Sequence, residues 1–311
     1  MDYLRYLARR ALYGVLVLFL AFTGSFFLLF VIPGDAAGAL SFGGDGGTDQ
    51  SVLDAQRKLL GIDRPVLVQY LDALLNALRG DFGTSFAHKQ SATEVYFSAF
   101  GMTLQLASLG LALALVFGFV LGLLTVLAPF AWLREALTSI PPLAASLPAF
   151  LTALLLLQFF AFGTGLIEPF NDDSFLGLFV ASLCIAIPGG SGIAQLLAVN
   201  LEQAMRSPYV ETLANWGLSR RAVILRHGVK NALLPVMTAF GTTVGGIFAG
   251  TVLTETVFSR NGVGRLIVDA VKGKDTPMVL ISVTVSAAIF VIVSLIVDAL
   301  YPLVDKRIKR A

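Results

Sequence analysis

Residues that could carry out chemistry are few in this chain and widely spaced. Its two histidines, His88 and His227, lie far apart in the sequence, so neither a metal-binding pair nor a histidine-based catalytic triad is expected. Cys184 is the only cysteine and lies inside an apolar stretch, which excludes a disulfide framework. Lys274 follows a glycine but lacks the earlier glycine and the hydroxyl residue of a phosphate-binding loop. The pattern predicts a protein that is not an enzyme and holds no metal or cofactor of its own.

The elements that must position any functional residue are strongly apolar. Of the 311 residues 56% are hydrophobic and 14% are charged, and the mean hydropathy is +0.81. A helix needs about 20 apolar residues to cross the hydrocarbon core of a bilayer. Six stretches meet this length, at 11–34, 95–133, 136–167, 174–201, 231–254 and 276–297. They are too uniformly apolar for the alternating strands of a barrel, so an all-α polytopic membrane protein with six transmembrane helices is predicted.

Basic residues cluster beside alternate ends of these spans, and this placement predicts the topology. They precede the first span, separate the second from the third and the fourth from the fifth, and follow the sixth, whereas one outer connection disagrees because it carries Arg260, Arg265, Lys272 and Lys274. Because cytoplasmic loops are enriched in Lys and Arg, both termini are expected in the cytoplasm. The predicted order is a cytoplasmic N-terminus (1–10), a first span (11–33), an extracytoplasmic insertion (34–100), a helical core (101–302) with a cytoplasmic loop (200–232), and a basic cytoplasmic tail (303–311).

The two insertions carry distinct local signals. In the outer one, a glycine-rich loop at 41–48 is followed by apolar residues at helical spacing over 51–60 and 66–78, with Pro65 placed to start the second helix. The cytoplasmic one predicts two short helices joined by a tight turn. Ser207 and Ser219 are expected to be the N-caps, Pro208 the first helical residue and Gly217 the left-handed residue that ends the first helix. The alternative is an ordinary basic loop, since cytoplasmic loops are basic in any case.

Polar and small residues inside the spans leave alternatives open. Gln105, Gln158, Gln195 and Asn200 could line a pathway or form hydrogen bonds between helices. The spacing of Gly241, Gly245, Gly246 and Gly250 permits close helix packing. Asp298 is expected to be an interfacial structural residue that reaches water at the cytoplasmic end of the last span. No residue of a substrate pathway is identified by these patterns.

Ten motifs, taken together, resemble the first permease of the dipeptide, oligopeptide and nickel group of type I ABC importers. They are YLARR (6–10), PGD (33–35), LGIDRP (60–65), QY (69–70), GDFGTS (80–85), YVETLANWGLS (209–219), RH (226–227), NALLP (231–235), ETVF (255–258) and GVG (262–264). Each motif alone is weak. Their order and spacing cover nearly the whole chain, and this is specific.

The resemblance implies a transport subunit of the bacterial cytoplasmic membrane that forms half of a pathway for di- or oligopeptides. It implies a homologous second permease, two ABC ATPase subunits or one fused ATPase that bind ATP and Mg²⁺, and an extracytoplasmic substrate-binding protein. The net charge of +2 suggests no nucleic-acid partner. A coupling helix at 208–216 would dock in a cleft of an ATPase. The residues assigned to this contact are Tyr209, Glu211, Thr212, Ala214, Trp216 and Gly217.

The chain departs from the family pattern within that helix. The pattern has a basic residue, an alanine and a lysine where Glu211, Leu213 and Trp216 stand, although Glu211 agrees with an older acidic form of the motif. These differences suggest that the chain has a matched ATPase of its own. A nickel or metallophore importer remains an alternative. A secondary transporter would be expected to show ionisable residues within its spans, and an intramembrane enzyme to show catalytic residues.

Overall fold

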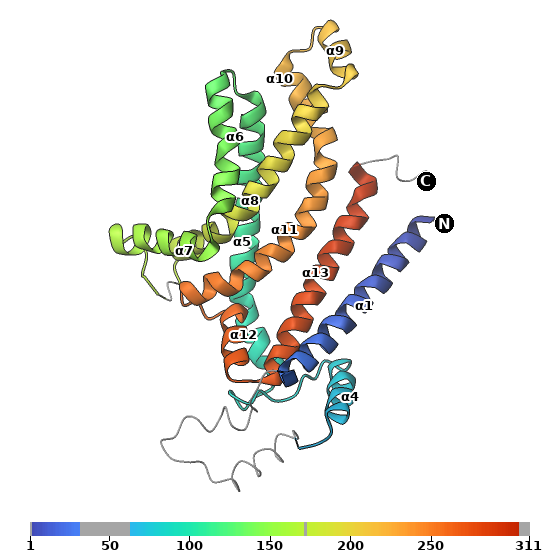
Figure 1. Ribbon diagram of the computed structural model, residues 1–311, viewed down its shortest axis with the longest axis vertical. Coiled ribbons are helices and arrows are strands. Elements are labelled where there is room, and N and C mark those ends of the chain that lie inside the picture. Colours follow the sequence, from blue (N-terminus) through green and yellow to red (C-terminus); the bar gives the residue numbers. More distant parts are fainter. Residues whose placement is uncertain (1, 32–62, 171–172, 305–311) are drawn as a thin grey trace. The chain divides into compact units, whose positions relative to one another are not determined.

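The computed structural model describes residues 2–31, 63–170 and 173–304. Throughout these residues the regular structure is helical, apart from one isolated bridge between Thr84 and Ser91. Among these residues, five helices are long and apolar enough to cross a membrane, and the number rises to six if one pair of helices with a bend between them counts as one span. The five are α1 (Asp2–Val31), α5 (Ala92–Leu127), α8 (Phe175–Met205), α11 (Val229–Val257) and α13 (Thr276–Val304). The predicted all-α multi-span fold is confirmed (Figure 1).

The described residues form two compact units, of which the first contains residues 2–8, 104–260 and 292–304. Its central element is α8, which packs against α11 and α6 (Ala131–Ser146) (Figure 1). More than half of the apolar window of α8 is buried, at 56%. The apolar side chains of its buried cluster are mostly small or aliphatic, which allows the helices to interdigitate. This core holds the segments that follow α8 in place.

The closest helix contact of this unit lies between α5 and α8. A Cβ added at Gly118 would lie 2.7 Å from Cβ of Ile193, and one at Gly190 would lie 2.7 Å from the carbonyl oxygen of Ala114. Glycine is therefore required there for the backbones to approach. The glycines of α11 that the spacing singled out differ from one another. A Cβ at Gly241 or Gly246 would have nothing within 4 Å, whereas one at Gly250 would lie 2.9 Å from Cγ2 of Ile185 in α8. The close packing that this spacing permits does not occur within the chain at Gly241 and Gly246.

The third predicted span, 136–167, is not one helix. It is divided into α6 and the pair α7 (Ala149–Leu157) and η1 (Gln158–Gly163), and the two parts are bent by 100° at the break (Figure 1). Leu147 has φ −71° and ψ 125°, an extended conformation, and Pro148 follows it. Because proline disfavours the helical conformation of the residue before it, the helix ends there. The prediction of one span over 136–167 followed the apolar composition and missed this break.

The second unit contains residues 9–31, 63–103 and 261–291. Its helix α4 (Val66–Ala77) confirms the helix expected after Pro65, and packs on α1 through Tyr70, which contacts Phe22 and Phe26 and shares a hydrogen bond with Thr23. A buried cluster joins the start of α5, the short helix α12 (Val263–Lys272) and the start of α13. The predicted glycine-rich loop and the helix at 51–60 lie outside the described residues.

Candidate functional site: a capped helix between two spans

The segment between α8 and α11 contains the short helix α9 (Pro208–Asn215), which lies beyond the adjacent ends of these two helices in Figure 1. Ser207 is its N-cap residue and Pro208 its first residue, as predicted. The Ser207 side chain makes no capping hydrogen bond and its hydroxyl donates instead to the carbonyl oxygen of Gln203 at 3.4 Å. Glu211 lies in the first turn, where a carboxylate interacts favourably with the helix dipole.

The C-terminus of α9 is closed by backbone hydrogen bonds that require Gly217. The amide of Gly217 donates to the carbonyl oxygen of Ala214 at 2.9 Å, and the amide of Leu218 donates to that of Leu213 at 3.2 Å. These two bonds form a Schellman motif, in which the first residue past the cap is left-handed. Gly217 has φ +82°, so the predicted left-handed residue is confirmed. Both ends of α9 are thus fixed by local sequence.

The second helix of the loop is not short, which corrects the sequence prediction. Ser219 caps α10 (Arg220–Val223) as expected, because its hydroxyl oxygen accepts from the amide of Ala222 at 3.3 Å. The chain then continues without a break through the π-helical turn η2 (Ile224–Gly228) into α11. The π-helical turn η2 packs against the end of α8, since a Cβ added at Gly228 would lie 3.3 Å from the Leu201 side chain. A single helical rod therefore leads from the tight turn into a membrane span.

A side-chain contact also ties α9 to that rod. The amide nitrogen of Asn231, at the start of α11, donates to the hydroxyl oxygen of Tyr209 at 3.1 Å. Sequence analysis placed both residues in family-like motifs but did not pair them, because they lie in different helices. A displacement of α9 would therefore reach α11 through this bond as well as through the turn.

The surface of α9 is available for contact with another protein. No residue of the helix is buried within the chain. Glu211, Thr212 and Ala214 are exposed, and Trp216 at its C-terminal cap has 74% of its surface exposed. A large, rigid aromatic side chain next to a short amphipathic helix is typical of the anchor of a protein interface. All six residues assigned from the sequence therefore lie on one capped helix and its turn.

The polar residues within the spans are placed differently from one another. Asn200 donates to the carbonyl oxygen of Leu196 in its own helix at 2.7 Å, so it joins no second helix through this bond. Gln195 lines a cavity of about 290 Å³ between α5, α6 and α8, together with Thr138 and Glu202. Gln105 and Gln158 are exposed. Asp298 does not reach water as expected, since it is buried and accepts a hydrogen bond from Tyr6 at 3.4 Å.

Comparison with known proteins places this arrangement in a family. Residues 91–310 match the model described as binding-protein-dependent transport system inner membrane component, and residues 3–107 match that of its N-terminal part. A solved structure, described as an amino acid ABC transporter with histidines, covers 69% of this chain and 94% of its own, with 17% identity and a TM-score of 0.48.

Relatives of the same kind match nearly the full length of the chain. The glutathione transport system permease protein GsiC of Pectobacterium atrosepticum is 29% identical over 98% of this chain and 99% of its own length. The proteins of the same name from Shigella boydii and Escherichia coli K12 are each 28% identical over the same shares. The capped helix between two spans, the multi-span helical fold and these matches agree. The chain belongs to the family of binding-protein-dependent transport system inner membrane components, the permease subunits of ABC importers.

Proposed function

We propose that this chain is the first permease subunit of an ABC importer for short peptides, and that α9 is the coupling helix that docks in a cleft of an ATPase subunit. The observation that carries the proposal is the geometry of α9, which begins at Ser207 and Pro208, is closed at its C-terminus by backbone hydrogen bonds and has no buried residue. A tight turn joins it to the continuous helix that runs from α10 into the membrane-spanning α11. Such a helix transmits a push at its surface as a rigid-body movement of the span.

The assembly follows from the family. A homologous second permease completes the pathway, two ABC ATPase subunits or a fused ATPase hydrolyse ATP, and an extracytoplasmic binding protein delivers the substrate. ATP binding would close the ATPases and shift the permease pair between its two conformations. The topology proposed from the distribution of Lys and Arg places α9 and both termini in the cytoplasm. The peptide class is supported by the relatives, which are named for transport of glutathione, itself a tripeptide.

Site-specific cross-linking tests the docking of α9. The one native cysteine, Cys184, is buried, so a chain carrying Trp216→Cys has one exposed thiol among the described residues. A matched control is Trp132→Cys, because Trp132 has 68% of its surface exposed and lies at the end of a span predicted to face the same side. We expect a thiol-to-amine cross-linker to join the first variant, in native membranes, to a subunit that binds ATP. Capture of that subunit from the control position but not from Trp216 would contradict the docking.

A reconstitution experiment tests the substrate class. Complexes purified in mild detergent through a tag on this chain are placed in proteoliposomes with the binding protein. We expect ATP-dependent uptake of glutathione and of di- or tripeptides. Uptake of nickel with no uptake of peptides would replace the peptide assignment by the metal-importer alternative, and transport by this chain without any ATPase would refute the importer itself.

A further inference from the structure

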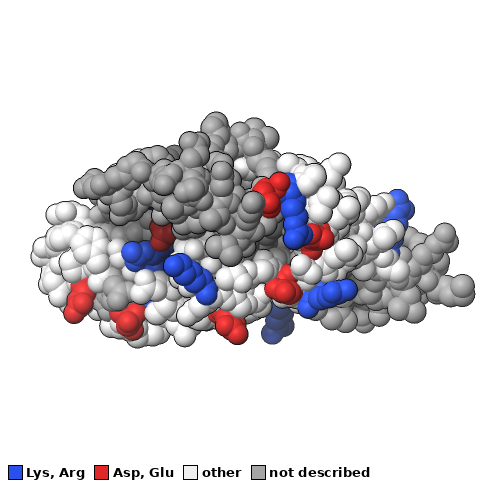
Figure 2. Space-filling model, turned by 90° about the horizontal axis from the view of Figure 1, so that it is seen from below, with Lys and Arg blue, Asp and Glu red and all other residues white. Residues whose placement is uncertain are grey.

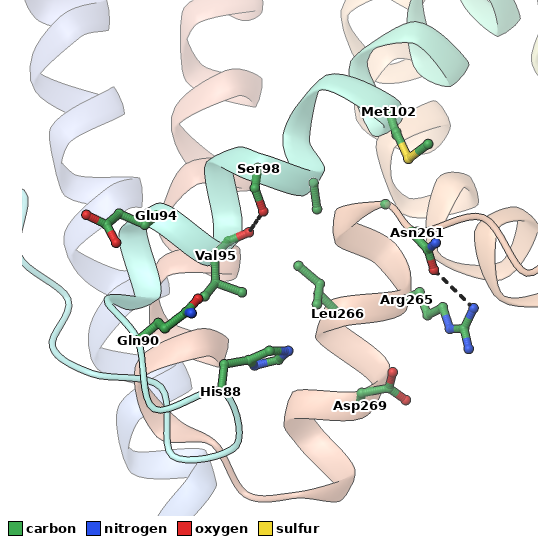
Figure 3. A pocket seen from close by; sticks show the side chains of 12 residues that line it. His88, Gln90, Glu94, Val95, Ser98, Met102, Asn261, Arg265, Leu266 and Asp269 are labelled. Carbon is green, nitrogen blue, oxygen red and sulfur yellow. Dashed lines mark hydrogen bonds between the residues drawn. The ribbon is translucent and has the colours of Figure 1, made fainter. Parts of the chain in front are cut away.

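A pocket of about 730 Å³ lies in the second unit, between the first turns of α5, the loop before it and the helix α12 (Figure 3). Its apolar side is formed by Val95, Met102 and Leu266. Its ionisable groups are one imidazole, two carboxylates and one guanidinium, from His88, Glu94, Asp269 and Arg265. Pockets of this size, with an apolar wall and a few polar groups, are typical of sites for small molecules.

The imidazole on this pocket is held in one orientation by a buried network. The hydroxyl of Ser85 donates to Oδ2 of Asp275 at 2.5 Å, and Asp275 is only 1% exposed. The same carboxyl oxygen accepts from the amide of Ala87 at 3.1 Å. The Ser85 oxygen accepts from the backbone amide of His88 at 3.0 Å and lies 3.1 Å from Nδ1 of that ring. Hydrogen bonds thus join the loop that carries Ser85 and the His88 side chain to Asp275, the residue before α13.

This network selects the tautomer of His88. A serine hydroxyl has one proton to donate, and here it goes to the buried carboxylate, so the Ser85 oxygen can only accept from the ring. The proton of neutral His88 must therefore be on Nδ1, which leaves Nε2 as a hydrogen-bond acceptor. Figure 3 shows the ring pointing from its loop toward α12, which carries Asp269. The pocket therefore presents two kinds of acceptor, an imidazole nitrogen and carboxylates.

We propose that this pocket binds the N-terminal ammonium group of a short peptide, with Nε2 of His88 and the carboxylate of Asp269 as acceptors. Glu94 adds a second negative charge. Arg265 on α12, whose guanidinium donates to Oδ1 of Asn261 at 3.3 Å, supplies the positive charge that binds the carboxylate end of the peptide. Charge-assisted bonds of this kind are about twice as strong as neutral ones. The inference rests on the proposed peptide importer and on its topology, which places the pocket on the outer side.

Two other ligand classes fit the pocket less well. No group of three or more His, Cys, Asp or Glu side chains able to hold a metal ion occurs among the described residues, which argues against a nickel site here. A simple anion would face two carboxylates and one guanidinium. In Figure 2, which shows the chain from below, acidic and basic side chains are interspersed over the described surface in view. Selection would therefore come from the local groups and not from a broad field of one sign.

The test measures binding of a peptide in the absence of the binding protein. The complex of this chain with its permease and ATPase partners is placed in nanodiscs, and trialanine and N-acetyl-trialanine are titrated by saturation-transfer NMR. We expect wild type to bind trialanine at least about tenfold more tightly than the acetylated peptide, because acetylation removes the charge-assisted bonds. This preference should be lost in Asp269→Asn and in His88→Ala. The matched control Asp63→Asn, an exposed carboxylate of the same unit outside the pocket, should keep it.

Ser85 is a positioning residue, and the preference for the free ammonium group reports its role. Ser85→Ala should lower the preference because the ring is no longer fixed, whereas Ser85→Thr keeps the hydroxyl and should restore it. A purely structural defect would weaken binding of both peptides alike. Equal binding of the two peptides by wild type, binding of neither, or a preference that survives both pocket substitutions would overturn the proposal. Uptake of trialanine by the same complex with its binding protein reports separately on the importer, so the two can fail independently.

Discussion

Replacement of Gly217 tests whether the capped geometry of α9 is needed for transport. Its φ of +82° lies in the left-handed region, which costs an L-residue about 1–2 kcal/mol. A Cβ built there meets nothing within 4 Å, so this backbone term is the whole expected effect of Gly217→Ala. A penalty of this size changes the equilibrium ratio between two states of the hairpin, which consists of α9, the turn at Gly217 and α10, by a factor of about 5–30. In one state the C-terminal cap of α9 is formed, and in the other it is broken. Gly217→Val should cost more, since a β-branched residue is rarely left-handed.

The assay is ATP-driven peptide uptake by the reconstituted complex, with circular dichroism to confirm that the spans remain helical. We expect uptake to fall in Gly217→Ala, by no more than about 5–30-fold, and to fall further in Gly217→Val. Gly217→Asn should remain closer to wild type, because asparagine adopts the left-handed conformation more readily. Gly165 provides a matched control, as it has φ +65° and equally open space but lies outside the hairpin. Normal uptake by Gly217→Val, or an equal loss in Gly165→Ala, would refute the coupling role of α9.

Three further experiments test neighbouring parts of the structure. Gly118→Val should lower the apparent melting temperature in detergent, since overpacking costs about 1–3 kcal/mol, while Gly241→Val, with open space, should not; equal shifts would contradict the α5–α8 contact. A double-mutant cycle of Tyr209→Phe and Asn231→Ala, read by uptake, should show an interaction of about 0.5–1.5 kcal/mol, and additive effects would remove the tether. Ser219→Ala should increase amide hydrogen exchange at the start of α10, because it removes an N-cap hydrogen bond worth about 1 kcal/mol. Ser207→Ala should leave exchange at the start of α9 unchanged, because Ser207 makes no capping hydrogen bond. A larger increase in Ser207→Ala than in Ser219→Ala would contradict the cap assignment.

The sequence by itself determined the features that depend on local chemistry. Long apolar stretches can only be helices in a bilayer, so the multi-span helical fold was predictable from composition. Proline at the first helical position and glycine at a left-handed position act through their own backbone preferences, so Pro208 and Gly217 defined α9 without knowledge of its neighbours. Pro148 was also a local signal, because the residue before a proline disfavours the helical conformation and Leu147 is extended. The prediction of a single span gave more weight to the apolar composition and missed the bend.

Only the tertiary structure decided which residues from distant segments meet. Small-residue spacing occurs in both α5 and α11, and the packing of α8 decides that Gly118 lies in close contact while Gly241 does not. Continuity of α10 with α11 depends on a π-helical turn that rests on α8, and no single residue type predicts such a turn. The orientation of His88 depends on Ser85 and on Asp275, almost two hundred positions later in the chain. Propensities act over a few residues, whereas a site of this kind is formed by contacts that folding alone brings together.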